Sequence, residues 1–283
     1  MKIYIDGLFY TGSGIGRYYS SLIKEFSRRG IEIITTVPSH LEKSFNKDFN
    51  DFSTLKPIFV NYEKFSLKGF FKQGKILKSL EKEVDLFFYP HINLPSYIPD
   101  KLIVTIHDLI PYTQFWDRNL LKKIIFKVLI NRAINKSYKI ICISETVKRN
   151  VLNVYNRSIE NKIVVIYRFI DIKFYNPSFE GIDNVKKPYI LFVGNRKKHK
   201  NIEGLIKAFL LISDHVQHNL VIVGAKDKQD RLSILIEKSG KSERIFQIFS
   251  IPDEELLYIY KHADLLILPS FFEGFGLPPL EAV

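Results

Sequence analysis

Cysteine is nearly absent from this chain of 283 residues, which contains only Cys142. A single thiol cannot form a disulfide within the chain, and a cysteine-based zinc site needs several closely spaced ligands. The sequence therefore excludes a small module held together by disulfides and a zinc domain built from cysteines.

Long hydrophobic runs are absent as well. No stretch of about 18 apolar residues occurs, and the longest apolar region, Ile124–Ile134, is interrupted by Lys127, Asn131 and Arg132. The first residues turn at Gly7 without the apolar segment and cleavage site of a signal peptide. We therefore expect a cytoplasmic protein without a membrane-spanning helix.

The composition is that of a basic globular protein. Hydrophobic residues make up 46% and aromatic residues 14% of the chain, so sizeable cores and about two domains are expected. Lysine and arginine outnumber aspartate and glutamate by 42 to 30, for a net charge of +12. This excess fits an anionic partner or membrane surface, or a compositional bias spread over solvated faces. Nucleic-acid binding is not expected, because no recognised motif accompanies the charge.

Short apolar runs alternate with longer segments of helical period, which predicts an α/β protein with parallel sheets covered by helices. A stretch rich in turn residues divides the chain into residues 1–178, a linker at residues 179–188 and a second lobe at residues 189–283. The strands expected in the first lobe are Lys2–Ile5, Ile31–Thr36, Ile58–Val60, Leu86–Tyr89, Lys101–Ile106 and Lys139–Ile143, with helices at Tyr18–Arg29, Gly74–Glu83 and Leu120–Ser137. Those expected in the second lobe are Tyr189–Val193, Asn219–Val223, Ile245–Phe249 and Leu265–Leu268, with helices at Ile202–Ser213, Arg231–Ser239 and Asp253–His262.

A glycine-rich turn, Gly12–Tyr18, lies between the first expected strand and the first helix. Small residues such as Gly14 and Gly16 let backbone N–H groups approach an anion at a helix N-terminus. The spacing differs from the dinucleotide-binding fingerprint, so a ligand loop and a tight structural turn both fit.

His107 and Asp108 follow the fifth expected strand, at the end where open α/β sheets bind ligands. The imidazole can contact a sugar hydroxyl, and the carboxylate can orient it or contact an acceptor. A structural histidine is the alternative. Ser144 follows the next strand and is better explained as the N-cap of a helix.

Two loops of the expected second lobe carry charge. The loop Gly194–Asn201 contains Arg196 and Lys200 between a strand and a helix, which favours a diphosphate site over a solvated basic loop. Farther along, Glu273 and Glu281 flank a loop in which Gly274, Phe275 and Gly276 precede a helix. Carboxylates there can accept hydrogen bonds from sugar hydroxyls while loop amides hold a phosphate.

These motifs together resemble glycosyltransferase family 4 over nearly the whole chain, and the pair Glu273–Glu281, with seven residues between them, is the most diagnostic. The resemblance implies the GT-B fold, in which two Rossmann-like doubly wound lobes face each other. It also implies transfer of a sugar from a nucleotide donor with retention of anomeric configuration, in surface polysaccharide or lipopolysaccharide synthesis. Likeness to a subfamily suggests that the sugar is mannose, that the donor is GDP-mannose, and that the acceptor is a glycan or a lipid-linked molecule.

The resemblance also assigns roles to residues. Glu281 is expected to hold the ribose, and Glu273 and the amides of residues 274–276 the donor sugar. Lys200 and Arg196 are expected to neutralise the diphosphate, together with the turn at Gly194. His107 is expected to contact the donor sugar, and Gly14 and Gly16 to line the phosphate and acceptor side. No acidic pair stands in a convincing metal position, so no metal and no cofactor are expected and the cations stabilise the leaving group instead.

Two departures from the family pattern stand out. Tyr167 and Arg168 occupy the turn where the family usually has an Asn-Gly pair. The chain also stops soon after Pro278, where the family continues with further strands and a helix, so we expect an incomplete second lobe and a fragment of a longer protein.

Alternatives stay open at this stage. A catalytically silent module that binds a nucleotide or a glycan would share the same motifs. An NAD-dependent oxidoreductase of two lobes is disfavoured, because the dinucleotide-binding fingerprint is missing. Basic and aromatic residues in Tyr62–Lys78 and Lys122–Lys127 fit either peripheral docking at the inner face of the cell membrane or ordinary helices with solvated lysines.

Overall fold

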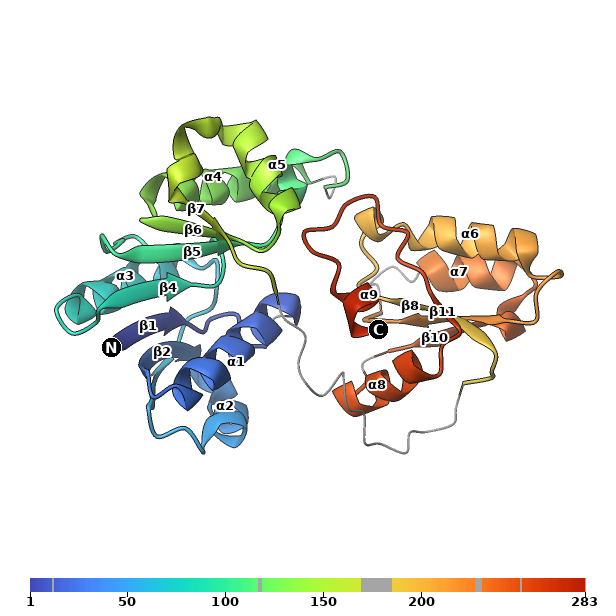
Figure 1. Ribbon diagram of the computed structural model, residues 1–283, viewed down its shortest axis with the longest axis horizontal. Coiled ribbons are helices and arrows are strands. Elements are labelled where there is room, and N and C mark those ends of the chain that lie inside the picture. The colour runs from blue at the N-terminus through green and yellow to red at the C-terminus, as the bar shows by residue number, and fades with distance from the viewer. Residues whose placement is uncertain (12, 117–118, 169–184, 227–230, 250, 283) are drawn as a thin grey trace. The chain divides into compact units, whose positions relative to one another are not determined.

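The computed structural model describes residues 1–11, 13–116, 119–168, 185–226, 231–249 and 251–282 (Figure 1). The chain forms two compact units. The first lobe comprises Met1–Tyr112 and Asn119–Arg168, and the second comprises Phe169–Val283 together with Thr113–Arg118. The predicted linker, residues 179–188, lies outside the described residues as far as residue 184.

The first lobe is built on a parallel sheet of seven strands in the order β3-β2-β1-β4-β5-β6-β7. Its strands are β1 (Lys2–Asp6), β2 (Glu32–Pro38), β3 (Leu55–Val60), β4 (Leu86–Tyr89), β5 (Leu102–Ile106), β6 (Lys139–Cys142) and β7 (Ile163–Val165). Consecutive residues such as Ile3, Tyr4 and Ile5 are all buried, as expected for a parallel sheet with both faces covered. The strand order reverses between β1 and β4, so a ligand crevice is expected at their carboxyl ends.

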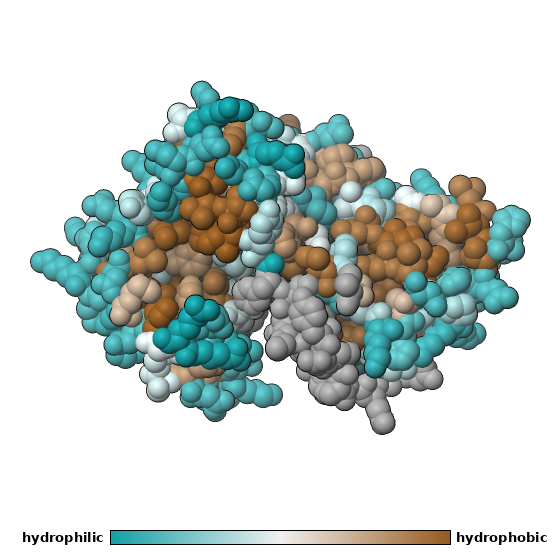
Figure 2. All heavy atoms as spheres, in the orientation of Figure 1, coloured by the Kyte–Doolittle hydropathy of each residue, from teal (hydrophilic) through white to brown (hydrophobic). Residues whose placement is uncertain are grey.

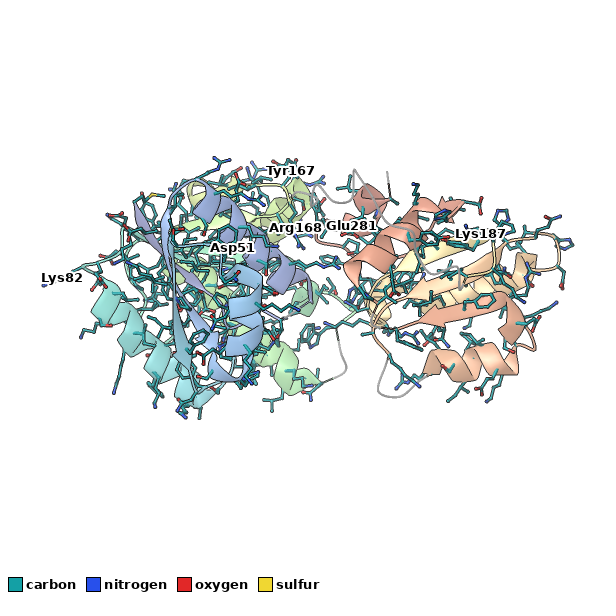
Figure 3. The ribbon with its side chains drawn as sticks, turned by 90° about the horizontal axis from the view of Figure 1, so that it is seen from below. Asp51, Lys82, Tyr167, Arg168, Lys187 and Glu281 are labelled. Atoms are coloured by element: carbon teal, nitrogen blue, oxygen red, sulfur yellow. The ribbon has the colours of Figure 1, made fainter. Side chains whose placement is uncertain are left out.

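Helices pack against both faces of this sheet, with α1 on one face and α3 and α4 on the other (Figure 3). They are α1 (Ser13–Arg28), α2 (Glu42–Phe49), α3 (Leu67–Leu80), α4 (Leu120–Lys136) and α5 (Glu145–Tyr155). The Ser144 hydroxyl accepts the Val147 N–H at 3.1 Å at the start of α5, which confirms the predicted N-cap.

The structure extends two helices beyond the sequence prediction. Helix α3 begins at Leu67 instead of Gly74, because the Ser66 side chain caps it by accepting the Gly69 N–H at 2.9 Å. Gly74 is needed inside it, since a Cβ there would lie 2.3 Å from Ser96 Oγ. Helix α1 begins at Ser13 instead of Tyr18, and α2 and β7 were not predicted.

The second lobe has a parallel sheet of four strands in the order β10-β9-β8-β11, and its four predicted strands are confirmed. The elements are β8 (Tyr189–Val193), β9 (Asn219–Val223), β10 (Ile245–Ile248) and β11 (Leu265–Leu266), with helices α6 (Ile202–Ile212), α7 (Arg231–Lys238), α8 (Asp253–Lys261) and α9 (Leu277–Glu281). Side chains of β8 alternate between the two cores. Ile190 and Phe192 pack with α6, and Tyr189 and Leu191 pack with α8.

Hydrophilic side chains cover much of the visible face of the first lobe, and hydrophobic ones reach the surface in patches (Figure 2). Among the helices of the described ranges, none is both long and apolar enough to cross a bilayer.

Candidate functional site

The candidate donor site lies at the carboxyl ends of β8 and β11, where the strand order of the second sheet reverses. The two charged loops predicted from the sequence meet there. The Phe271 N–H donates to the His199 carbonyl at 2.8 Å, and the Asn201 side-chain amide donates to the Pro269 carbonyl at 3.2 Å. These hydrogen bonds hold the loop after β8 against the loop after β11.

The same loops bring Lys200 and Glu273 into an ion pair. Lys200 Nζ lies 2.6 Å from Glu273 Oε1, and the two side chains are only 12% and 25% exposed. A charge-assisted hydrogen bond of this kind is shielded from much of the competing water. The pair places a cation and a carboxylate, both predicted site residues, at one point of the sheet edge.

Arg196 is held on the other side of β8. Its Nη1 donates to Gln247 Oε1 at 2.5 Å, and its guanidinium stacks 4.5 Å from the centre of the Phe249 ring. Gln247 belongs to β10, the edge strand opposite β11. The two predicted diphosphate cations are therefore anchored toward opposite edges of the sheet.

The turn at Gly194 depends on a second glycine. Gly224, after β9, has a φ of 154°, and a Cβ added there would lie 1.9 Å from the Gly194 carbonyl oxygen. The Gly194 N–H donates to Val223 and the Gly224 N–H to Ile248. The ends of β8 and β9 can approach this closely only because position 224 lacks a side chain.

The second glutamate of the motif is anchored to α8. The Tyr260 hydroxyl donates to Glu281 Oε2 at 2.8 Å, and Glu281 is labelled in Figure 3. Between the glutamates, Gly274 and Phe275 are partly buried. Gly276 precedes α9 with a φ of 82°, a left-handed conformation that favours glycine.

His199 is a site residue that the sequence analysis did not single out. Its side chain is buried, and burial followed by the neighbouring Lys200 charge lowers its pKa to about 4. The loop that carries Lys200 therefore also contains a buried, neutral imidazole. In the sequence, its position between Lys198 and Lys200 was the signal that could have pointed to His199.

In the first lobe, the glycines predicted to lie in a loop belong to the first turns of α1. A Cβ at Gly16 would lie 2.3 Å from the Tyr10 carbonyl oxygen, so the helix can approach the preceding loop only with glycine there. Arg168 donates from Nη2 to the Gly14 carbonyl at 2.9 Å, and its guanidinium lies 5.7 Å from the centre of the Tyr18 ring. Gly12 lies outside the described residues.

His107 is held in one tautomer. Its Nε2 donates to the Pro90 carbonyl at 2.8 Å, which leaves Nδ1 as an acceptor. Burial lowers the pKa of His107 to about 4, against the opposing effect of the Pro90 carbonyl, and the Arg168 charge lowers it further. Asp108 accepts the Ile110 N–H at 3.0 Å, so one carboxylate oxygen shapes the turn that follows.

A buried polar cluster beside β1 was missed from the sequence. His91 Nε2 donates to Asp6 Oδ1 at 2.7 Å, and Gln73 donates to Asp6 Oδ2 at 2.8 Å. Asp6 ends β1 and His91 follows β4, so both lie where the first sheet reverses its order. The signal was present, because each is a polar residue at or just after the end of an apolar strand.

The cluster is connected to His107 through the chain. His91 follows Pro90, whose carbonyl accepts the His107 N–H. The Asn93 N–H donates to His91 Nδ1 at 3.2 Å, so both ring nitrogens of His91 are engaged. Within the described residues, no group of three or more His, Cys, Asp or Glu side chains is arranged to hold a metal ion.

Comparison of the sequence with models of protein families shows the family of the chain. The family model described as Glycosyltransferase Family 4 matches residues 12–174, more than half of the chain. The chain belongs to glycosyltransferase family 4. The model described as Glycosyl transferases group 1 matches residues 177–283. The first match covers most of the first lobe of this family 4 protein, and the second lies within its second lobe.

Curated relatives of the family 4 chain include enzymes of O-antigen synthesis. The O-antigen chain mannosyltransferase RfbU of Salmonella typhimurium is 30% identical over 181 residues, which cover 64% of this chain and 48% of RfbU. The O-antigen chain mannosyltransferase B of Escherichia coli is 24% identical over 307 aligned positions, covering 97% of this chain and 77% of that protein. The match to RfbU thus spans about half of its length.

Solved structures establish the GT-B fold. Sucrose-phosphate synthase from Thermosynechococcus elongatus aligns with a TM-score of 0.75 at 17% identity, covering 100% of this chain and 78% of that one. Anabaena HepE in complex with UDP-glucose aligns with a TM-score of 0.70 at 16% identity and the same coverage. The predicted α/β class and the family resemblance are therefore confirmed, whereas the roles of individual site residues remain predictions.

Proposed function

We propose that the protein transfers a mannosyl group, with retention, from a nucleoside-diphosphate donor to a glycan or lipid-linked acceptor in surface polysaccharide synthesis. The observation that carries the proposal is the Lys200–Glu273 pair at the edge of the second sheet, with Glu281 eight positions farther along the chain. The O-antigen mannosyltransferase relatives support the choice of sugar.

The proposed donor contacts combine these positions with the roles that the family resemblance implies. The diphosphate accepts hydrogen bonds from Lys200, which then shares its charge between Glu273 and the phosphate oxygens. Glu273 and the amides of residues 274–276 contact the sugar, and Glu281, oriented by Tyr260, accepts from the ribose hydroxyls. In the reaction, the bond from the anomeric carbon to the diphosphate breaks, a bond to the acceptor hydroxyl oxygen forms, and the proton of that hydroxyl passes to the departing diphosphate.

His107 of the first lobe contributes a neutral imidazole in this scheme. Because its Nε2 is engaged with Pro90, its Nδ1 accepts a hydrogen bond from a sugar hydroxyl. Asp108 keeps the turn beside it in shape through Ile110. Lys200 and Arg196 stabilise the charge that develops on the leaving diphosphate, with no metal assigned to this role.

Calorimetric titration with GDP, UDP and ADP in the presence of EDTA tests the donor site. Tight binding of one diphosphate identifies the donor base and supports a metal-free site, whereas absence of binding by all three contradicts the assignment of Lys200 and Glu281. Release of GDP from GDP-mannose, measured with and without an acceptor extract, then separates a transferase from a binding module without turnover.

A further inference from the structure

Helix α4 presents an apolar stripe to solvent. Leu120, Leu121, Ile124, Ile125 and Val128 are between 47% and 72% exposed. They recur at intervals of four residues, so they occupy one side of the first turns of the helix. An exposed apolar stripe of this kind is typical of a surface that contacts a membrane or another molecule.

The second half of the same helix behaves differently. Ile130, Ala133 and Ile134 are buried against the lobe. Arg132 fixes this half by donating to the carbonyls of Leu94 at 2.9 Å and Ser96 at 3.1 Å. The exposed stripe therefore belongs to an anchored helix whose first turns project apolar side chains outward.

Helix α3 continues the apolar surface. Leu67 is 80% exposed and Phe71 is 58% exposed at its start. The Phe65 and Phe126 rings lie 5.5 Å apart, which joins the residues before α3 to α4. Arg132 of α4 stacks 5.2 Å from the centre of the Phe70 ring. The two helices are neighbours (Figure 3), and we call the seven exposed residues Leu67, Phe71, Leu120, Leu121, Ile124, Ile125 and Val128 the α3–α4 surface.

The charges of these helices have a single sign. Helix α3 carries Lys68, Lys72, Lys75 and Lys78, and α4 carries Lys122, Lys123, Lys127, Arg132 and Lys136. Neither helix contains an aspartate or glutamate. Lysine side chains can extend their ammonium groups away from apolar neighbours that penetrate a less polar medium.

We propose that the α3–α4 surface docks on an anionic lipid bilayer. Aliphatic and phenylalanine side chains enter the interfacial region, and the lysines beside them contact anionic headgroups. Protein interfaces are depleted in lysine, so a protein partner fits this surface less well. Docking would bring the lobe to the surface that carries a lipid-linked acceptor, but the proposal does not depend on the transfer reaction.

Co-sedimentation of the full chain with vesicles tests the proposal without any sugar donor. Vesicles of phosphatidylcholine containing phosphatidylglycerol should bind the chain, and vesicles of phosphatidylcholine alone should bind it at least about tenfold more weakly. The double variant Leu121→Ser/Ile125→Ser and the double variant Lys72→Gln/Lys122→Gln should each lower binding to the anionic vesicles about tenfold or more. All four residues are exposed, so thermal unfolding should match that of the original chain.

Matched controls come from α6 of the second lobe. Leu211 is 82% exposed and Lys207 is exposed on the same helix, so Leu211→Ser and Lys207→Gln should leave vesicle binding unchanged. Equal losses in the control variants, or no binding to anionic vesicles, would overturn the proposal. So would a change from dimer to monomer caused by Leu121→Ser/Ile125→Ser in analytical ultracentrifugation without lipid, which would make a second copy of the chain the occupant.

Discussion

Lys200 Nζ lies 2.6 Å from Glu273 Oε1, although the two residues are 73 positions apart in the sequence. Each side chain follows a different strand, and the two strands, β8 and β11, pair in parallel at the point where the sheet reverses its order. Because the pair is only partly exposed, removing either partner leaves a charge in a site with little water to solvate it.

Replacing Lys200 with methionine should weaken binding of the cognate nucleoside diphosphate about tenfold or more, with a much smaller effect on the nucleoside. The reason is that the ammonium group supplies a charge-assisted hydrogen bond to phosphate, commonly about 1.5–3 kcal/mol. Calorimetry with both ligands measures the difference. Lys197→Met is the matched control, because Lys197 is exposed in the same loop. Similar losses in the two variants would remove the diphosphate role from Lys200.

Replacing Glu281 with alanine should weaken nucleoside and nucleoside diphosphate alike, because the proposed contact is to the ribose. Tyr260→Phe should cause a smaller loss, about 1 kcal/mol, since it removes only the hydroxyl that orients the carboxylate. The exposed Glu237 on α7 provides the control Glu237→Ala. Unchanged affinity for Glu281→Ala would rule out the ribose contact.

The two glycines at the start of α1 should respond differently to alanine. Gly16→Ala should lower the free energy of unfolding by about 1–3 kcal/mol, because the new Cβ would lie 2.3 Å from the Tyr10 carbonyl oxygen. Gly14→Ala should change it by less than about 1 kcal/mol, since the nearest atom is the end of the Arg168 side chain at 3.4 Å. Denaturant titration of both variants measures the difference, and equal effects would contradict the close approach at Gly16.

Stability should fall as the pH drops from about 6.5 to about 4. His107 and His199 both have pKa values lowered to about 4, from 6.5, chiefly by burial. Over this window the unfolded chain binds more protons than the folded one, so the stabilisation present above pH 6.5 is lost on acidification, at up to about 1.4 kcal/mol per pH unit for each group.

Substitution of one histidine tests this pH dependence. His199→Asn should lower the slope of the unfolding free energy against pH between about 4 and 6.5 and leave the contribution of His107, whereas His215→Asn at an exposed position should leave the slope unchanged. Denaturant titrations at several pH values supply the slopes. A slope in His199→Asn that equals that of the original chain would show that His199 does not contribute to the acid sensitivity.

Much of the fold could be predicted from periodicity. The bounds of β4, β8 and β9 agree with the expected strands, because each contains a run of at least four apolar residues flanked by turn or polar residues. The start of α3 was missed, since Gly69 and Gly74 weaken the local helical signal and only the Ser66 cap and the contact with Ser96 reveal why the helix continues.

The candidate site was predicted unevenly. Lys200 and Glu273 could be named because charged residues in loops after strands are conspicuous against apolar surroundings, and Glu281 because of its spacing from Glu273. Asp6 and His91 could not be paired in the same way, because their contact depends on β1 and β4 being neighbours while β2 and β3 intervene in the chain. A local sequence pattern is enough to find the first set of residues, whereas the second contact depends on the order of strands in the sheet.

The sequence by itself determined the alternation of strands and helices, the loops that carry charge and the family to which the chain belongs, because these depend on local spacing. Only the tertiary structure decided that Lys200 pairs with Glu273, that Arg196 is held toward β10, and that His107 donates to Pro90. Each of these contacts joins segments that are brought together by the order of strands in a sheet, and strand order follows from packing across the whole lobe.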